Sequence, residues 1–422
     1  MISYVIPTRD RAERLTATLH ALSRLHARLD RTNPALAAEI IVIDNDSTER
    51  MILQPHLPCG TPIRSINLRT NEGAAARNHG VRAADPRSDW IVMLDDDSHP
   101  LDTNFIQLLN QQPEDVGAVM ADIWLPHRDE SSSQVHTASD DAHNHINSLR
   151  NIKLGIRESG GLPEVFIGCG VAIRKSAFLA AGGYDHTFQY YVEEYDLAAK
   201  LLIAGYRVAF EPRFRVLHHK DSGQRDMNTI LERLVRNNGW VAQRYAPDEQ
   251  RLPELREVRS RYRKIAKKEH ALAGYSRGLI QLKNTIRTQL RTPMSHELFE
   301  RFTGVAHARM ALQRAYTSKP FSAATLIENG KNAWAVAHAL DQLGIRVTDD
   351  HEMADVLVVA TMSPGPMLDA FTRRHNLAKS TLPASRSPRV LGPWLVIEPV
   401  PRHQEPQSKP ATPTETSARD AA

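Results

Sequence analysis

The chain has 422 residues but only two cysteines, Cys59 and Cys169. They lie far apart and lack the short spacing of zinc ligands, so neither a disulfide framework nor a zinc site is expected. No run of about 18 apolar residues is present, which argues against a membrane-spanning helix. A basic stretch followed by an apolar one is also missing at the N-terminus, so we expect no signal peptide. These absences favour a soluble protein of the cytoplasm.

The chain also lacks a strong charge of either sign. Its 53 basic and 49 acidic residues leave a formal net charge of +4, which does not indicate a nucleic-acid partner. Apolar residues make up 41% and charged residues 24%, as in an ordinary globular protein. The length is comfortable for two domains.

Three short apolar runs in the first 100 residues, separated by helical patterns, predict parallel strands at Ile2–Ile6, Ile40–Ile43 and Trp90–Leu94. Each run stops at polar residues. Because ligands bind outside the carboxyl ends of strands in open α/β sheets, these three ends define one candidate site.

The rest of the chain divides by composition. Residues 126–161 are rich in Ser, His, Asp and Asn and predict a long loop or a lid. Residues 251–291 are basic and helical, with three open interpretations: a solvated helix face, a contact with anionic lipid at the inner face of the membrane, or a dimer surface.

A second, smaller α/β pattern follows, with strands at Ala323–Ile327, Ile345–Val347 and Val356–Ala360 and a helix at Asn332–Leu343. Gly330 is interpreted as a strand-to-helix turn, because the spacing of a phosphate loop is incomplete. We therefore expect four segments: a domain at 1–245, a basic helical segment at 246–318, a small α/β domain at 319–400 and a disordered tail at 401–422.

The tightest chemical signal is Asp95-Asp96-Asp97 after the third strand. Carboxylates suit hard cations such as Mg²⁺ and Mn²⁺, and such an ion suits a diphosphate. Asp95 and Asp97 point the same way in an extended chain, so they can share a site. An isolated acidic triplet is also a common solubilising turn, so the surrounding motifs decide its meaning.

Those motifs, in order, resemble the family 2 glycosyltransferases, which are inverting enzymes with the GT-A fold. The resemblance covers residues 2 to about 240. It is carried by Val5 to Arg11, Val42 to Ser47, Asn71 to Gly80, Leu94 to Asp97, Gly182 to Asp185, and Glu193 to Leu197.

The resemblance implies a nucleotide-sugar pocket at the strand ends. Pro7, Thr8 and Arg9 would line it. Asp44 would accept a hydrogen bond from the base, Asp95 would contact the ribose side, and Asp97 would ligate the metal. Arg77 would bind the donor diphosphate, since a guanidinium matches phosphate geometry, or else form a surface ion pair.

The segment Glu193-Glu194-Tyr195-Asp196 matches the acidic E-D-x-D-L pattern of the family. The second acid of that pattern is the catalytic base, which implies this role for Glu194, one methylene longer than the usual Asp. Glu193 would lie in the acceptor or donor-sugar pocket, and Asp196 is a candidate for a structural role. The other interpretation is an acidic helix start that complements the helix dipole.

Two further groups complete the expected site. Gly168 and Gly170 permit close backbone approach to the donor sugar, while Cys169 between them is interpreted as a buried small residue. Of the adjacent His218 and His219, His218 fits the H-x-x-x-S spacing that completes the metal or diphosphate site in relatives, although a lone histidine is often structural.

Taken together, we expect a metal-dependent glycosyltransferase that uses Mg²⁺ or Mn²⁺ and moves a sugar from a nucleoside-diphosphate donor to a hydroxyl acceptor. The acceptor would be a glycan, a lipid-linked molecule or a small molecule, as in polysaccharide biosynthesis. Two alternatives remain: a sugar-nucleotide nucleotidyltransferase, disfavoured because a Gly-rich, Lys-containing N-terminal loop is missing, and a non-catalytic nucleotide-sugar-binding protein.

Overall fold

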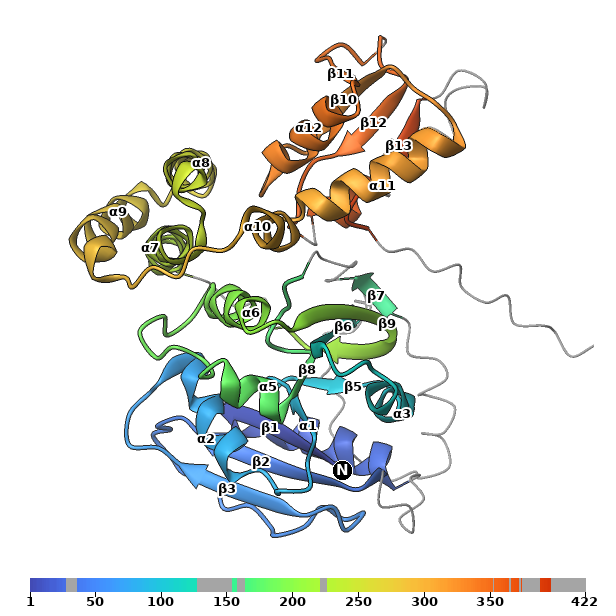
Figure 1. Ribbon diagram of the computed structural model, residues 1–422. Coiled ribbons are helices and arrows are strands. Elements are labelled where there is room, and N and C mark those ends of the chain that lie inside the picture. Colours follow the sequence, from blue (N-terminus) through green and yellow to red (C-terminus); the bar gives the residue numbers. More distant parts are fainter. Residues whose placement is uncertain are drawn as a thin grey trace, which may run out of the picture.

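A computed structural model describes residues 1–27, 36–126, 154–157 as backbone, 164–220, 226–351, 353–363, 366–371, 373 and 388–395 (Figure 1). Most of the loop expected at 126–161 and all of the tail expected at 401–422 lie outside these residues. One part of that loop is described and is a strand, at 154–157.

A nine-stranded mixed sheet forms the N-terminal half of the described chain, in the order β3-β2-β1-β4-β8-β6-β9-β5 with β7 paired to β6. Its strands are β1 (Ile2–Thr8), β2 (Ala38–Asp44), β3 (Ile63–Asn67), β4 (Trp90–Met93), β5 (Ser98–Pro100), β6 (Val116–Pro126), β7 (Leu154–Arg157), β8 (Val171–Arg174) and β9 (Arg207–His218). The three predicted strands are confirmed as β1, β2 and β4, which pair in parallel. Their carboxyl ends therefore meet at one edge.

Helices pack on this sheet (Figure 1). They are α1 (Ala12–His26), the 3₁₀ turn η2 (Gly73–Ala76), α2 (Arg77–Ala83), α3 (Asn104–Asn110), α5 (Lys175–Ala180) and α6 (Glu193–Ile203). Contact between α2 and β1 is close, because a Cβ added at Gly80 would lie 2.6 Å from Val5 Cγ1. This contact fixes α2 directly beneath the strand ends.

The helical nature predicted for 251–291 is confirmed. It contains most of α8 (Asp248–Lys268), all of α9 (Leu272–Thr285) and the 3₁₀ turn η3 (Ile286–Thr288). Before it lies α7 (Met227–Tyr245), and after it lie α10 (His296–Thr303) and α11 (Val305–Ser318); α7 to α11 together are called the helical linker. Leu231, Val258 and Tyr262 belong to a small apolar core of their own between these helices. Nowhere in the described ranges does a helix combine the length and apolar character needed to cross a bilayer.

The C-terminal sheet is parallel, in the order β11-β10-β12-β13. Its strands are β10 (Ala323–Ile327), β11 (Arg346–Val347), β12 (Val356–Val359) and β13 (Arg389–Leu391), and α12 (Ala333–Gln342) follows β10. The three predicted strands are confirmed as β10, β11 and β12, and the predicted helix as α12. The fold class is also confirmed: a large α/β domain, a helical linker and a smaller α/β domain. The domain borders stay predictions.

Gly304 joins the helical linker to the C-terminal sheet. Its φ of 87° is left-handed, and it ends α10 and starts α11 at a single residue. The Trp394 indole N–H donates to the Gly304 carbonyl at 2.8 Å, and Asn332 Nδ2 donates to the Thr303 carbonyl at 2.8 Å. The small domain is therefore bonded directly to this joint.

Candidate functional site

A cavity of about 930 Å³ opens at the carboxyl ends of β1 and β4. This volume lies near the upper end of the usual range for ligand pockets, about 300–1,000 Å³. Its walls come from distant parts of the chain, including Pro7, Thr8, Arg9, Arg11, Arg77, Asp95, Asp96, Gly168, Tyr190, Glu193, Glu194, His218, Arg233 and Pro366. Most of the predicted site residues thus share one cavity.

The aspartate triplet is held by hydrogen bonds from the end of β1. Thr8 Oγ1 donates to Asp96 at 2.8 Å, and the Arg11 guanidinium bonds both Asp96 and Asp97 at 2.6 Å. Burial raises the pKa of Asp96 to about 6, although Arg11 opposes the shift. Asp96 and Asp97 are therefore part of a local charge network, and Asp95 is the member most open to the cavity, with its side chain 39% exposed.

Arg77 begins α2 and is buried, with its side chain only 8% exposed. It donates to the Asp95 carboxylate and, at 3.5 Å, to the Leu94 carbonyl. Burial acts against its charge, but Asp95 and Glu194 keep its pKa above the ordinary value. The ion pair joins α2 to the end of β4 inside the cavity wall, so it does not lie on the surface.

His218 ends β9 beside the aspartates. Its Nε2 lies 3.3 Å from Asp97 Oδ1, and its Nδ1 lies 3.6 Å from the Cys169 sulfur. Asp97 Oδ1 is buried and makes no hydrogen bond within the described ranges. His219 turns elsewhere, since its ring stacks on His99 at 5.6 Å.

This corner fits a divalent cation. An orphaned carboxylate oxygen beside an imidazole nitrogen is a plausible pair of ligands, and Mg²⁺ commonly takes one or two carboxylates plus phosphate oxygens. A second grouping of possible ligand atoms, from Asp95, Cys169 and His218, lies within 4.8 Å. Both groupings share His218, so Cys169 lies closer to the candidate metal than its sequence context indicated.

Glu193 and Glu194 begin α6 and line the cavity together. The Gly168 backbone N–H donates to Glu194 Oε1 at 3.3 Å, while Glu193 Oε2 is buried and has no hydrogen-bond partner within the described ranges. Burial raises the pKa of both carboxyl groups, and the charge of Glu194 adds to the effect on Glu193. The pair therefore holds a proton more tightly than two exposed glutamates would.

A left-handed loop places these acids. Gln189, Tyr191 and Val192 have φ values of 60°, 70° and 73°, which are strained for residues with side chains. Asn237 of α7 holds the loop, because its Nδ2 donates to the carbonyls of Phe188, Tyr190 and Tyr191 at 3.2, 3.2 and 2.7 Å.

Gly73 supports the same loop from the other side. A Cβ at this position would lie 2.2 Å from the Gln189 carbonyl oxygen, so only glycine fits. The neighbouring Ala74 N–H donates to that oxygen at 2.8 Å. Loop strain is therefore balanced by contacts from both the sheet domain and the helical linker.

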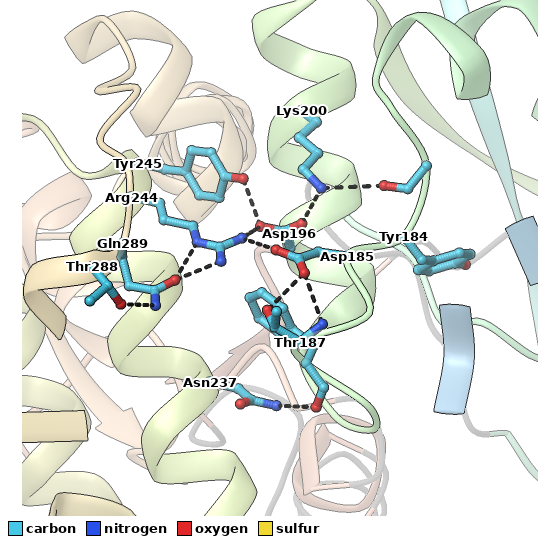
Figure 2. A network of polar contacts seen from close by, with 12 residues as sticks. Tyr184, Asp185, Thr187, Asp196, Lys200, Asn237, Arg244, Tyr245, Thr288 and Gln289 are labelled. Carbon is cyan, nitrogen blue, oxygen red and sulfur yellow. Dashed lines mark hydrogen bonds and ion pairs between the residues drawn. The ribbon is translucent and has the colours of Figure 1, made fainter. Parts of the chain in front are cut away.

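Asp196, two residues after Glu194, faces away from the cavity into a buried network (Figure 2). Arg244 and the Tyr245 hydroxyl donate to one of its oxygens at 2.8 and 2.6 Å, and Lys200 pairs with the other at 2.6 Å. Arg244 also bonds Asp185 at 2.8 Å. The network attaches α6 to α7, which agrees with the structural role considered for Asp196.

Three predicted residues do not line the cavity: Asp97, which is buried behind it, Asp44 and Gly170. Asp44 lines a neighbouring hollow of about 410 Å³, where its Oδ1 accepts from the Ser47 N–H at 2.8 Å. Thr8 and Arg11 line both hollows, so this one extends the first. Gly170 packs into the sheet instead, since an added Cβ would lie 3.1 Å from Ile123.

Several lining residues were not anticipated from the sequence. Arg11 follows the first strand end closely and could have been found from that position. Tyr190 lies in the strained loop, Arg233 on α7 and Pro366 after β12. None of these three belongs to a motif, and only folding brings them to the strand ends.

The parallel strand ends, the buried acids and the cavity define an α/β domain suited to a nucleotide ligand. Residues 3–180, less than half of the chain, match the family described as Glycosyl transferase family 2, so this part of the chain is similar to the family 2 glycosyltransferases. The recognition from sequence is thereby confirmed.

One relative and two solved structures illustrate the similarity. An "Uncharacterized glycosyltransferase" of Haemophilus influenzae is 27% identical over 207 residues, covering 48% of this chain and 62% of the relative's own length. S. aureus TarS 1-349 in complex with UDP-GlcNAc is 12% identical, with a TM-score of 0.45 over 76% of this chain and 88% of that one. The mannosyltransferase PcManGT from Pyrobaculum calidifontis, in complex with GDP-Man and Mn²⁺, is 16% identical, with a TM-score of 0.38 over 81% and 86%.

Proposed function

We propose that the protein is a glycosyltransferase that moves a sugar from a nucleoside-diphosphate donor to a hydroxyl acceptor, with inversion at the anomeric carbon. One observation carries the proposal: the strand-end acids Asp95 and Asp96 and the Glu193–Glu194 pair line a single cavity in a domain similar to family 2. Such a transfer needs an acid that can accept the proton of the acceptor hydroxyl, and carboxylates nearby that can bind a metal ion.

The donor would bind along the strand ends. Pro7, Thr8 and Arg9 line the nucleotide side, and Asp44 would accept from the base in the adjoining hollow. Asp95 would contact the ribose side. Arg77 would face the diphosphate, although its present partner is Asp95.

Asp97 and His218 would hold Mg²⁺ or Mn²⁺. When bound, the ion would stabilise the negative charge that develops on the leaving diphosphate. The hydrogen bond from Arg11 keeps Asp97 oriented. Because Asp97 is buried, its negative charge is stabilised by positively charged partners.

Glu194 would act as the base that removes the proton from the acceptor hydroxyl. Its raised pKa makes it a stronger base than an exposed glutamate, and general bases work best when their pKa lies near the operating pH. The Gly168 N–H orients one of its oxygens, and Glu193 would contact the sugar.

The accessory parts complete the proposal. We assign the transfer chemistry to 1–245 and the acceptor choice to the 246–318 and 319–400 segments, from which Pro366 reaches the cavity. The acceptor would be a glycan, a lipid-linked molecule or a small molecule, encountered in the cytoplasm or at the inner face of the membrane through 251–291.

A donor screen tests the function. The purified protein would be incubated with UDP-GlcNAc, GDP-Man and other nucleotide sugars, with Mg²⁺, with Mn²⁺ and with EDTA, and the released nucleotide would be measured. We expect nucleoside diphosphate from one donor, only with a divalent ion, and its loss in Asp97→Ala.

The products separate the alternatives. Release of pyrophosphate from a nucleoside triphosphate incubated with a sugar 1-phosphate would indicate nucleotidyl transfer and overturn the proposal. Binding of a nucleotide sugar with no turnover under any metal condition, either to water or to a panel of acceptors, would favour the binding protein instead.

A further inference from the structure

Arg233 lies on α7, beyond residues 3–180 that match the family, yet its side chain lines the same cavity as Asp95 and Glu194. No role for this residue follows from the motifs. Within the described part of the chain no carboxylate forms an ion pair with its guanidinium. In this respect it differs from the other arginines of the cavity.

The other cavity arginines have carboxylate partners. Arg11 bonds Asp96 and Asp97 at 2.6 Å each, and Arg77 pairs with Asp95. Arg9 is half exposed and lies 3.8 Å from Asp10. Their charges are therefore largely compensated before any ligand enters.

Arg233 is held by an aromatic ring instead of an acid. Its guanidinium carbon lies 5.5 Å from the centroid of the Tyr190 ring, and the Tyr190 hydroxyl donates to Asn71 at 3.2 Å. A cation over an aromatic face is oriented without being neutralised. The guanidinium thus keeps its hydrogen-bond donors for another group.

The nearest acid on the helix is already engaged. Glu232 bonds Arg277 at 2.5 Å and Gln281 at 2.6 Å, both on α9. Arg236, one turn on, does not line the cavity and offers no negative charge, and its pKa is lowered by burial and by Arg233. This wall of the cavity therefore carries uncompensated positive charge, which attracts anions.

We propose that Arg233 binds a phosphate group of a substrate in this cavity. A guanidinium matches phosphate oxygens through two parallel N–H bonds, and Tyr190 fixes its plane beforehand. The phosphate can come from the diphosphate of the donor or from a phosphorylated acceptor. The inference rests on the proposed function for the identity of the substrates, but phosphate binding itself can be measured without turnover.

Calorimetric titrations of the full chain in Mg²⁺ test the proposal. The first arm compares UDP and GDP with uridine and guanosine in wild type and in Arg233→Gln. Because a charge-assisted hydrogen bond is lost, a donor phosphate on Arg233 predicts an affinity for the diphosphate at least about tenfold weaker in the variant. Nucleoside affinity would not change.

The second arm addresses the acceptor. Methyl phosphate is titrated into protein saturated with the nucleoside diphosphate, and a phosphorylated acceptor predicts binding that Arg233→Gln abolishes and Arg233→Lys partly restores. Arg256→Gln, an exposed arginine of the neighbouring α8, is the matched control and should behave as wild type in both arms. Thermal melting establishes that each variant is folded.

Affinities within twofold of wild type for both the nucleoside diphosphate and methyl phosphate in folded Arg233→Gln would overturn the inference. Its failure is distinct from that of the proposed function. If Arg233→Gln selectively loses phosphate binding but the wild-type protein transfers no sugar, the proposed function fails and the inference stands. If Arg233→Gln transfers sugar and binds phosphate like the wild type, the inference fails and the proposed function stands.

Discussion

Two carboxylates in the first turn of α6 have opposite surroundings. Glu194 faces the cavity, has no cation within ion-pair distance among the described residues and has a raised pKa. Asp196 is completely buried and is bonded by Arg244, Tyr245 and Lys200. One short acidic motif thus supplies both an acid for chemistry and an anchor for the helix.

The difference shows how an unstable arrangement is maintained. Two neighbouring carboxyl groups at Glu193 and Glu194 are costly to bury, and the loop before them is strained. The Asp196 network and Asn237 fasten the same turn to α7 and offset these costs. The four variants below separate the two roles.

The largest effect is expected for Glu194→Gln. The variant keeps the shape of the side chain but cannot accept a proton, and loss of general-base catalysis costs about 10²–10⁴-fold in rate. Turnover under saturating donor measures it. Melting temperature should be unchanged or higher, because a buried carboxylate has been removed; a rate within threefold of wild type would contradict the assignment of the base.

Asp196→Ala should act on stability first. Removing one partner of a buried ion pair costs about 3–5 kcal/mol, because Arg244 and Lys200 lose their shared acceptor. Urea unfolding measures the change. Asp115→Ala, which removes an exposed pair with Arg207, is the control and should cost less than about 1 kcal/mol. Equal losses in the two variants would mean that the network does not anchor α6.

Asn237→Ala tests the loop. Three carbonyls lose a donor, so we expect a stability loss of about 1–3 kcal/mol together with a fall in kcat, since Glu194 is no longer held in place. The adjacent Asn238→Ala breaks bonds to Leu234 and Tyr262 only and should lose stability without the fall in kcat. Parallel changes in kcat for both variants would count against a positioning role.

The smallest effect concerns pH. The pKa of Glu193 is raised by burial, so the folded protein binds this proton more tightly than the unfolded chain does, and stability falls as pH rises above the ordinary glutamate range. Glu193→Gln removes that contribution. Its unfolding free energy, compared with wild type at pH 5 and pH 8, should therefore show an advantage that grows with pH. An advantage that is constant or shrinks would reverse the sign of the shift.

The sequence predicted the sheet well, because its parallel strands are short apolar runs with polar ends, and a pattern of this kind depends only on local order. Ile2–Ile6 and Ile40–Ile43 became β1 and β2 with small extensions. The convergence of Thr8, Asp95 and Glu194 in one cavity also followed from motif order.

What the sequence could not indicate is which side of an element faces which neighbour. Asp196 and Glu194 look alike in the motif, and only the position of Arg244, 48 residues later, separates them. Arg233 and Pro366 reach the cavity through the packing of later segments. Gly170 resembles Gly168 in sequence, but in the turn before β8 Gly168 faces Glu194 while Gly170 faces Ile123.

Gly304 carries a mechanical consequence. Since α10 ends and α11 begins at this one left-handed residue, no further loop residues separate the two helices. The direction in which the chain leaves α11 therefore depends on the number of residues in that helix. Deleting a single residue from α11 would rotate the C-terminal sheet by about 100° around that helix. Such a rotation would break the bonds from Trp394 and Asn332 to this joint and carry Pro366 away from the cavity, so the length of α11 should matter more than the identity of residues on its exposed face.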